Sequence, residues 1–405
     1  MKAYERLIAY TAFPTASDET KEACPSTPAQ LDFGKALVEE MKALGIADAY
    51  RNGLGFVYGT LEATAPYEET VAFLAHMDVV DTVPYENIQT VLIEDYDGGE
   101  IRLADGTSRL SPSEFPVLSR YRGETLLVTD GRTLLGADDK AGVAEIMTMA
   151  ETLLAHPEIP HGRIRICFTP DEEIGSGILH IDVKELAADA AYTVDGGGFG
   201  EVDYETFNAS SAHVEFRGKS IHPGSAKDKM INAARVAMEF DGMIPEGQRP
   251  ERTEGRDGFY HLIGMKGEIE SAELDYILRD HDLGILASRE DTLRRITSYL
   301  NKKYGAGCVT LTIKESYRNM SEKILPAFYL VERAYEAIRE AGGEPVSPPV
   351  RGGTDGSRLS FMGVPCPNLG TGSHNHHGRL EFAVTEEMDK CVASLVGIAR
   401  RFAKA

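Results

Sequence analysis

Three short apolar segments of the chain each run directly into acidic or imidazole side chains. VAFLA (71–75) is followed by HMD, RIRICF (163–168) by TPDEE, and AAYTV (190–194) by DGGG. Apolar or alternating runs of this length are typical of buried strands in an α/β sheet. Ligands of such sheets gather at the carboxyl ends of the strands. The sequence therefore predicts an α/β layer fold that collects polar side chains at one edge.

Helical patterns alternate with these strands, as in KAGVAEIMTMAETLLAH (140–156). From about residue 207 the order becomes strand, helix, strand, strand, helix, strand, which is an α+β unit of ferredoxin-like type. After residue 322 helix and α/β patterns return. A chain of 405 residues suits about two domains. We therefore expect 207–322 to be inserted into a domain formed by 1–206 and 323–405.

The composition excludes several function classes. The net charge of −22 would repel a phosphate backbone or an anionic membrane. The N-terminal stretch MKAYERLIAYTAF favours an amphipathic helix over a signal peptide, and no apolar run approaches the ~18–20 residues of a membrane span. Five scattered cysteines form no CxxC pair. We interpret them as reduced thiols of a cytoplasmic protein.

Polar motifs fall at successive strand ends and glycine-rich turns: HMD (76–78), GADDKAG (136–142), TPDEE (169–173), VDGGG (194–198) and SHNHHG (373–378). Each alone has an ordinary explanation, such as a surface pair, a helix cap or a turn. Residues 76 and 78 of a strand face the same side, so Asp78 could orient the His76 ring and leave one ring nitrogen free for a metal. Five such motifs together indicate a metal site.

The motifs HMDVV, GADDKAG, TPDEEIG and VDGG, in this order, resemble the dinuclear zinc exopeptidases, a group that includes aminoacylases and desuccinylases. The segments IEDYDGGEIRL, LSPSEFPVL, IHPGSAK, RGGTDGSRLSFMG and PCPNLGTGSHNHHG are similar to the peptidase T family of tripeptide aminopeptidases within that group. The resemblance covers nearly the whole chain. It implies a zinc-exopeptidase-like catalytic domain, with a mostly parallel mixed sheet between helices, and an inserted lid or dimerisation domain.

The resemblance also implies a ligand set for two metal ions per subunit. One ion would be held by His76, Asp138 and Asp195, and the other by Asp138, Glu173 and His377. Asp138 would bridge the two ions, and His377 is preferred to His376 because it directly precedes the glycine of the motif. Imidazole and carboxylate ligands suit Zn²⁺, with Mn²⁺ and Co²⁺ as alternatives.

By the same resemblance, Asp78 and Glu172 belong to the catalytic machinery. Glu172 would be the general base, which takes a proton from the water between the two ions and passes it to the leaving amine. A cis peptide between Asp138 and Asp139 is also implied.

The resemblance also implies four residues that contact the peptide. Arg351 in RGGTDG would bind the C-terminal carboxylate, which in a tripeptide lies roughly 7 Å beyond the first peptide bond at ~3.3–3.6 Å per residue. His222 in IHPGSAK would hydrogen-bond the developing oxyanion, in the same subunit or across a homodimer. Asn232 and Lys227 are further candidates for substrate contact.

The sequence thus predicts a cytoplasmic, metal-dependent aminopeptidase that removes the N-terminal residue from tripeptides. An alternative within the same group is an N-acyl-amino-acid or related amidohydrolase, which would use the same metals and base with a different pocket. A non-catalytic metal-binding or peptide-binding protein is a third hypothesis, but such a protein would have no need of Glu172.

Overall fold

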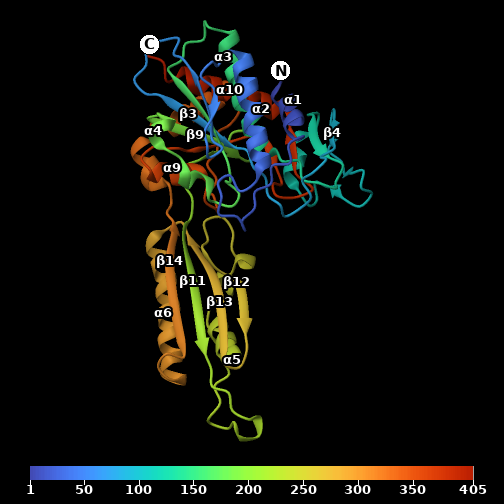
Figure 1. Cartoon of the computed structure of the whole chain (residues 1–405). Helices are drawn as coiled ribbons and strands as arrows, with labels where there is room; N and C mark the ends of the chain where they lie inside the picture. Colours follow the sequence, from blue (N-terminus) through green and yellow to red (C-terminus); the bar gives the residue numbers. More distant parts are fainter. Residues whose placement is uncertain (405) are drawn as a thin grey trace. The chain divides into compact units, whose positions relative to one another are not determined.

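The computed structural model describes residues 1–404, which form two compact units (Figure 1). Unit 1 comprises Met1–Tyr204, Met320–Pro348 and the chain from Thr354 onward, and unit 2 comprises Glu205–Asn319 and Pro349–Gly353. The predicted inserted segment, 207–322, lies largely within unit 2. Its role as a lid or in dimerisation stays a prediction.

Unit 1 is built around a seven-stranded mixed sheet in the order β1-β2-β8-β3-β9-β15-β10. The central pairs β8–β3, β3–β9 and β9–β15 are parallel, and the pairs toward both edges are antiparallel. The strands are β1 (Tyr50–Arg51), β2 (Val57–Leu61), β3 (Val71–His76), β8 (Ile164–Thr169), β9 (Ala190–Gly196), β10 (Val202–Asp203) and β15 (Asn368–Gly370).

Helices cover both faces of this sheet, as the prediction required (Figure 1). The larger core packs one face against α1 (Ala3–Tyr10), α2 (Pro28–Leu44), α3 (Ala137–Ala155), α8 (Tyr329–Glu340) and α10 (Thr385–Arg400). The other face packs against α4 (Val183–Leu186), α9 (Asp355–Phe361) and the 3-10 helix η2 (Gly177–His180). The short α7 (Ser321–Ile324) and the 3-10 helix η6 (Leu325–Ala327) lead into α8.

A second, smaller sheet in unit 1 has the order β16-β17-β7-β4 and is antiparallel throughout. Its strands are β4 (Thr90–Ile93), β7 (Leu126–Thr129), β16 (Ser373–His374) and β17 (Phe382–Val384). The hairpin of β5 (Ile101–Arg102) and β6 (Arg109–Leu110) and the 3-10 helix η1 (Pro116–Tyr121) contribute to the same small apolar core. This sheet carries the histidine-rich loop that follows β16.

Unit 2 has the predicted order of strands and helices. Its sheet has the order β12-β13-β11-β14, antiparallel throughout, which is the ferredoxin-like arrangement. The elements are β11 (Asn208–Arg217), α5 (Ala233–Gly242), β12 (Phe259–Gly267), β13 (Ser271–Asp280), α6 (Leu283–Tyr304) and β14 (Val309–Tyr317), with the 3-10 helices η3 (Pro223–Ser225), η4 (Glu246–Gln248) and η5 (Pro250–Arg252). Both α-helices pack on one face and form the core of the unit with it.

Two details of unit 1 differ from the sequence pattern. Arg165 and Cys167, on the second face of RIRICF, are buried like their neighbours, because helices cover that face of the sheet as well. The buried Arg165 guanidinium donates to the carbonyl of Leu186 and to the hydroxyl of Thr60. The helix predicted from residue 140 begins at Ala137, with non-helical backbone at Asp138 and Asp139. Among residues 1–404, no helix is long and apolar enough to cross a membrane.

Asp203, at the end of β10, is a carboxyl group that the fold keeps from ionising. Burial raises its pKa from 3.8 to about 7, and the nearby charge of Glu201 acts in the same direction. One carboxyl oxygen accepts a hydrogen bond from Asn368 at 3.1 Å, while the other is buried without a partner. The unfolded chain has no such environment, so its Asp203 ionises near the ordinary value.

We therefore expect Asp203→Asn to increase the free energy of unfolding at neutral pH and to change it little below pH ~4. Between pH 3.8 and about 7, the folded state holds one more proton at Asp203 than the unfolded state does. The free energy of unfolding of the wild type therefore falls as pH rises across that window, by up to about 1.4 kcal/mol per pH unit for this one group. Urea unfolding of both proteins across this window measures the difference. Asp389→Asn, at an exposed residue of α10, is the matched control, and an equal difference at every pH would contradict the assignment.

Candidate metal centre

The Asp138 carboxylate lies between two imidazole rings. One oxygen, Oδ1, is 2.9 Å from Nε2 of His76, and the other, Oδ2, is 3.0 Å from Nε2 of His377. The same nitrogen of His76 lies 3.3 Å from Asp195 Oδ1, and that of His377 lies 3.1 Å from Glu173 Oε2. The structure thus brings together all five predicted ligands, with Asp138 at the middle of the series.

The α/β topology supplies these side chains from separate parts of the chain. His76 ends β3, Asp195 lies near the end of β9, and Glu173 follows β8 in the next turn. Because these three strands are parallel neighbours, their carboxyl ends meet at one edge of the sheet. Asp138 comes from the start of α3, and His377 from the loop after β16.

The backbone before α3 is held by Glu381, a fully buried residue just before β17. Its carboxylate accepts the N–H groups of Leu135, Gly136 and Asp138, at 2.7–2.9 Å. The peptide bond between Asp138 and Asp139 is cis, as the resemblance implied. The Asp139 carboxylate accepts the N–H groups of His76 and Gly142 and so ties the end of β3 to α3.

The turn that carries the two glutamates is tied to Asp78. The two oxygens of the buried Asp78 carboxylate accept the N–H groups of Glu172 and Glu173, at 3.0 and 3.1 Å. Nδ1 of His76 lies 3.0 Å from the Asp78 backbone carbonyl and 3.4 Å from one of its carboxylate oxygens. Asp78 therefore contacts the His76 ring, as predicted, but its carboxylate chiefly fixes the glutamate turn.

The two adjacent histidines of SHNHHG have different contacts. Nε2 of His376 hydrogen-bonds the hydroxyl of Ser373 at 2.8 Å, and its Nδ1 lies 3.7 Å from Asp138. His377 contacts both Asp138 and Glu173 directly and keeps about half of its side chain exposed. The geometry therefore favours His377 over His376 as a ligand.

The electrostatics show how much negative charge is concentrated here. Burial raises the pKa of Glu173 to about 7, and burial together with the charges of Asp355 and Asp195 raises that of Glu172 well above its ordinary value. Burial also acts to raise the pKa of Asp138, but its contacts with His377 and His76 outweigh burial and hold that pKa well below the ordinary range. The hydrogen bonds to Asp138 and Glu173 raise the pKa of His377 to about 10.

The residues present fit divalent metal ions. Three or more ligand atoms lie within 4.8 Å of one another in two groups, one with His76, Asp138 and Glu173 and the other with His76, Asp139 and Asp195. Oε1 of Glu173 is buried without a hydrogen-bond partner, which is costly unless a cation or water satisfies it. In the second group Asp195 is the better ligand, because Asp139 already accepts two backbone N–H groups.

Comparison with known proteins agrees with this geometry. Residues 127–401 match the model of peptidase family M20/M25/M40. The chain belongs to this family. It is 48% identical to "Peptidase T" of Clostridium perfringens, over 100% of this chain and 99% of that protein. It is 46% identical to "Peptidase T" of Bacillus subtilis (strain 168), over 98% of both chains.

Solved structures of this peptidase family share the fold. The aminopeptidase PepT of Bacillus cereus superposes with a TM-score of 0.77 over 99% of both chains, at 23% identity. A protein of Bacillus subtilis described as a dinuclear metal binding peptidase from the M20 family has a TM-score of 0.66 over 98% of both chains, at 13% identity.

One buried acid beside the site of this M20 peptidase was not singled out in the sequence. Asp355 begins α9, accepts a hydrogen bond from Thr169 at 2.9 Å, and has a pKa raised to about 7 by burial. Its TDG context resembles an ordinary helix start, so the sequence carried no signal for it. Glu381 was missed as well, because a single glutamate beside a short strand forms no motif.

The four predicted substrate contacts belong to unit 2. His222 and Lys227 are exposed, and Nδ1 of His222 accepts the N–H of Gly224. Asn232 caps α5 through a hydrogen bond from the N–H of Arg235. The Arg351 guanidinium donates to the carbonyls of Gly255 and Asp257 and to the hydroxyl of Thr253, and it stacks on the rings of Phe207 and Phe259.

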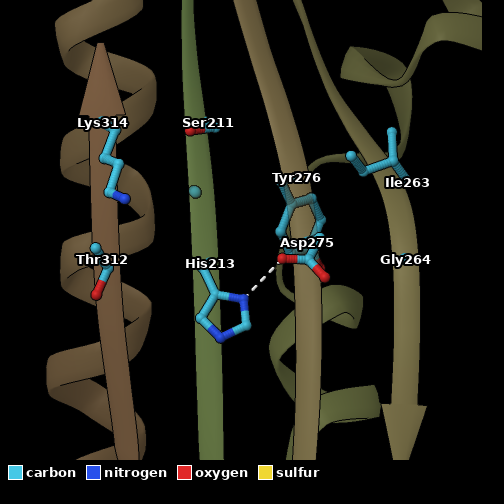
Figure 2. Close-up of a pocket in the computed structure, with 9 residues that line it drawn as sticks. Ser211, His213, Ile263, Gly264, Asp275, Tyr276, Thr312 and Lys314 are labelled. Atoms are coloured by element: carbon cyan, nitrogen blue, oxygen red, sulfur yellow. Dashed lines mark hydrogen bonds and ion pairs between the residues drawn. The ribbon is translucent and has the colours of Figure 1, made fainter. Parts of the chain in front are cut away.

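Unit 2 also has a hollow on the sheet face opposite its helices (Figure 2). His213 and Asp275 form an ion pair of 2.7 Å there, beside Lys314 and Ile263. The metal-ligand groups identified among residues 1–404 all lie in unit 1, so this hollow is not a second candidate centre.

Close packing of α3 against β9 predicts that a single methyl group will disturb the centre. A Cβ added at Gly142 would lie 1.8 Å from the carbonyl oxygen of Val194 and 2.5 Å from Asp139. We expect Gly142→Ala to move α3 away from Asp195, to cost about 1–3 kcal/mol of stability, and to weaken divalent-ion binding. Gly242→Ala, where no atom lies within 4 Å of the added carbon, is the matched control.

Thermal unfolding and metal content by mass spectrometry measure the two effects. Wild-type values for Gly142→Ala in both assays would show that α3 and β9 are not packed as described.

Proposed function

We propose that this M20-family chain is a dinuclear metal aminopeptidase that removes the N-terminal residue from tripeptides. The observation that carries the proposal is the series Asp195–His76–Asp138–His377–Glu173, with Glu172 beside it. Full-length similarity to proteins named Peptidase T supports the substrate class. The free cysteines support a cytoplasmic location. Formation of a homodimer stays a prediction.

The proposed ligands of one ion are His76, Asp138 and Asp195, and those of the other are Asp138, Glu173 and His377. Asp138 would bridge them, since its two oxygens face the two histidines separately. We propose Zn²⁺ as the resident metal, because the set combines imidazole and carboxylate and contains no thiolate. Two such ions polarise a carbonyl and lower the pKa of water.

Glu172 would act as the general base. Its backbone is fixed by Asp78. Burial, together with the nearby charges of Asp355 and Asp195, raises the pKa of Glu172 and so favours uptake of a proton. We propose that the Glu172 carboxylate accepts a proton from the attacking water and donates it to the nitrogen of the leaving peptide. We assign Glu173 to the metal instead, because its Oε2 contacts His377 and its Oε1 is buried without a partner.

Arg351 would bind the C-terminal carboxylate of the substrate. Its guanidinium donates to neutral oxygens, and among the described residues no carboxylate forms an ion pair with it. Nearby carboxylates are paired elsewhere, since Glu205 binds Arg256 and Asp280 binds Arg289. Arg351 thus keeps its charge for an anion, and its position is fixed by stacking on Phe207 and Phe259.

His222 would stabilise the developing oxyanion, and Lys227 and Asn232 would contact the peptide. The exposure of His222 and Lys227 is consistent with these roles. Asn232 already accepts a helix N–H through Oδ1, so its side-chain amide nitrogen would be the group that contacts the peptide.

Selection by length is tested with an unblocked tripeptide, the matching dipeptide and tetrapeptide, and an N-acetylated tripeptide. Cleavage confined largely to the free tripeptide, lost on chelation and restored by zinc, is the expected wild-type result. Arg351→Met should lose a charge-assisted hydrogen bond of ~1.5–3 kcal/mol, which corresponds to a rise in KM for the tripeptide of about 10- to 100-fold. The variant should also show a smaller difference in cleavage between the dipeptide, the tripeptide and the tetrapeptide.

Arg252→Met, at an exposed arginine of the same unit, is the control. Unchanged tripeptide kinetics in Arg351→Met would remove Arg351 from the proposal. Preference for the acetylated substrate would instead indicate an amidohydrolase, and cleavage of none of the four would favour a binding protein.

The separate roles of the two glutamates give a second prediction. Glu172→Gln should keep both metal ions and lose kcat by ~10²–10⁴-fold, because the amide cannot accept the proton. Glu173→Ala should lose one of the two ions. Metal analysis beside steady-state kinetics distinguishes the variants, and near-wild-type turnover by Glu172→Gln would refute the assignment.

A further inference from the structure

The turn that carries Glu172 and Glu173 is held by side chains from two other segments. Its three successive N–H groups, those of residues 171, 172 and 173, donate to Oε1 of Gln30 and to the two oxygens of Asp78. The turn has no strand or helix partner at these positions. Its direction therefore depends on Gln30 at one end and on Asp78 at the other.

The Asp171 side chain adds further hydrogen bonds to Ser26 and Gln30, and we call this group of three residues the clamp. The buried carboxylate of Asp171 accepts the N–H of Ser26 at 2.7 Å, the hydroxyl of Ser26 at 2.5 Å and the amide of Gln30 at 2.7 Å. The Gln30 amide thus binds both the backbone and the side chain of Asp171. The backbone of Asp171 is left-handed, with φ of 54°, a conformation that costs free energy for a residue other than glycine unless its surroundings hold it.

The chain that supplies the clamp is itself anchored to the other ligand loop. The hydroxyl of Thr15 donates to the carbonyl of Met77, and the N–H of Ser17 donates to the carbonyl of Val79. The N–H of Asp18 in turn donates to the hydroxyl of Ser26. Residues 15–30 therefore connect the loop after β3, next to His76, with the loop after β8, next to Glu173.

We propose that Gln30 and Ser26 are positioning residues of the metal centre, which act through Asp171 on the direction of Glu172 and Glu173. The proposal rests on the proposed function for the roles of the two glutamates. Neither Gln30 nor Ser26 contacts the predicted ligands. Without the Gln30 amide, the N–H of Asp171 would be buried and unpaired, and Oδ1 of its carboxylate would keep only the hydroxyl of Ser26 as a donor. The left-handed turn would then relax.

The test is Gln30→Met, which keeps an unbranched side chain of similar length and removes both hydrogen bonds to Asp171, together with those to the hydroxyls of Ser26 and Thr27. We expect kcat to fall about 10- to 100-fold with little change in KM, as for other residues that orient metal ligands without binding the metal themselves. The absorption spectrum of the Co²⁺-loaded protein should change as well, because the position of Glu173 is altered. Ser26→Ala should show a smaller effect of the same kind.

Leu37→Ala is the matched control, since Leu37 is fully buried on the same helix and has no part in the clamp. It should lower the melting temperature but keep the wild-type kcat and Co²⁺ spectrum. The proposal is overturned if Gln30→Met keeps the wild-type kcat and spectrum, or if Leu37→Ala changes both as strongly as Gln30→Met does. If the wild-type protein cleaves no tripeptide, the proposed function fails, and the Co²⁺ spectra still decide whether Gln30 orients Glu173.

Discussion

Unit 1 depends on a concentration of buried negative charge at one edge of its sheet. Asp78 and Asp139 are fully buried, and Glu172, Glu173 and Asp195 lie beside them with raised pKa values. Neighbouring carboxyl groups repel one another when ionised, so they stay together if they are protonated or if positive charge or hydrogen-bond donors compensate them. The two imidazole rings supply part of that compensation. At the proposed metal centre, divalent ions would supply the rest.

The surrounding fold provides donors in the form of backbone N–H groups. Asp78 accepts two of them, Asp139 two and Glu381 three, so each of these acids ties one ligand-bearing segment to another. The acids that are satisfied in this way differ from the acids left facing the histidines. The neighbours Asp138 and Asp139 illustrate this difference, because the Asp139 carboxylate accepts backbone N–H groups whereas the Asp138 carboxylate faces two histidines. The hydrogen-bond partners therefore separate structural carboxylates from candidate ligands more clearly than sequence position does.

Local patterns were enough to predict the fold class and a metal site at the strand ends, whereas the set of five proposed ligands came from the resemblance to the peptidase T family. His76, Asp195 and Glu173 follow apolar strands whose parallel pairing places them together, and the ferredoxin-like order of unit 2 was visible in its alternation. The supporting contacts were not predictable, because they join residues far apart in the chain. Gln30 meets Asp171 across 141 residues, and Glu381 meets Asp138 across 243. No local period records such pairs, and a lone glutamine at the start of a helix has no distinctive pattern.

The two units leave opposite charges uncompensated. In unit 1, cations would satisfy the unpartnered oxygen of Glu173 and reduce the repulsion between Glu173 and its acidic neighbours. In unit 2 Arg351 is bound by neutral oxygens, although the chain as a whole has an excess of 22 negative charges. In the proposed reaction, the C-terminal carboxylate of the peptide would bind Arg351, and metal ions would bind beside Glu173. The charges that the fold leaves unpaired therefore correspond to the substrate and cofactors of the proposed reaction.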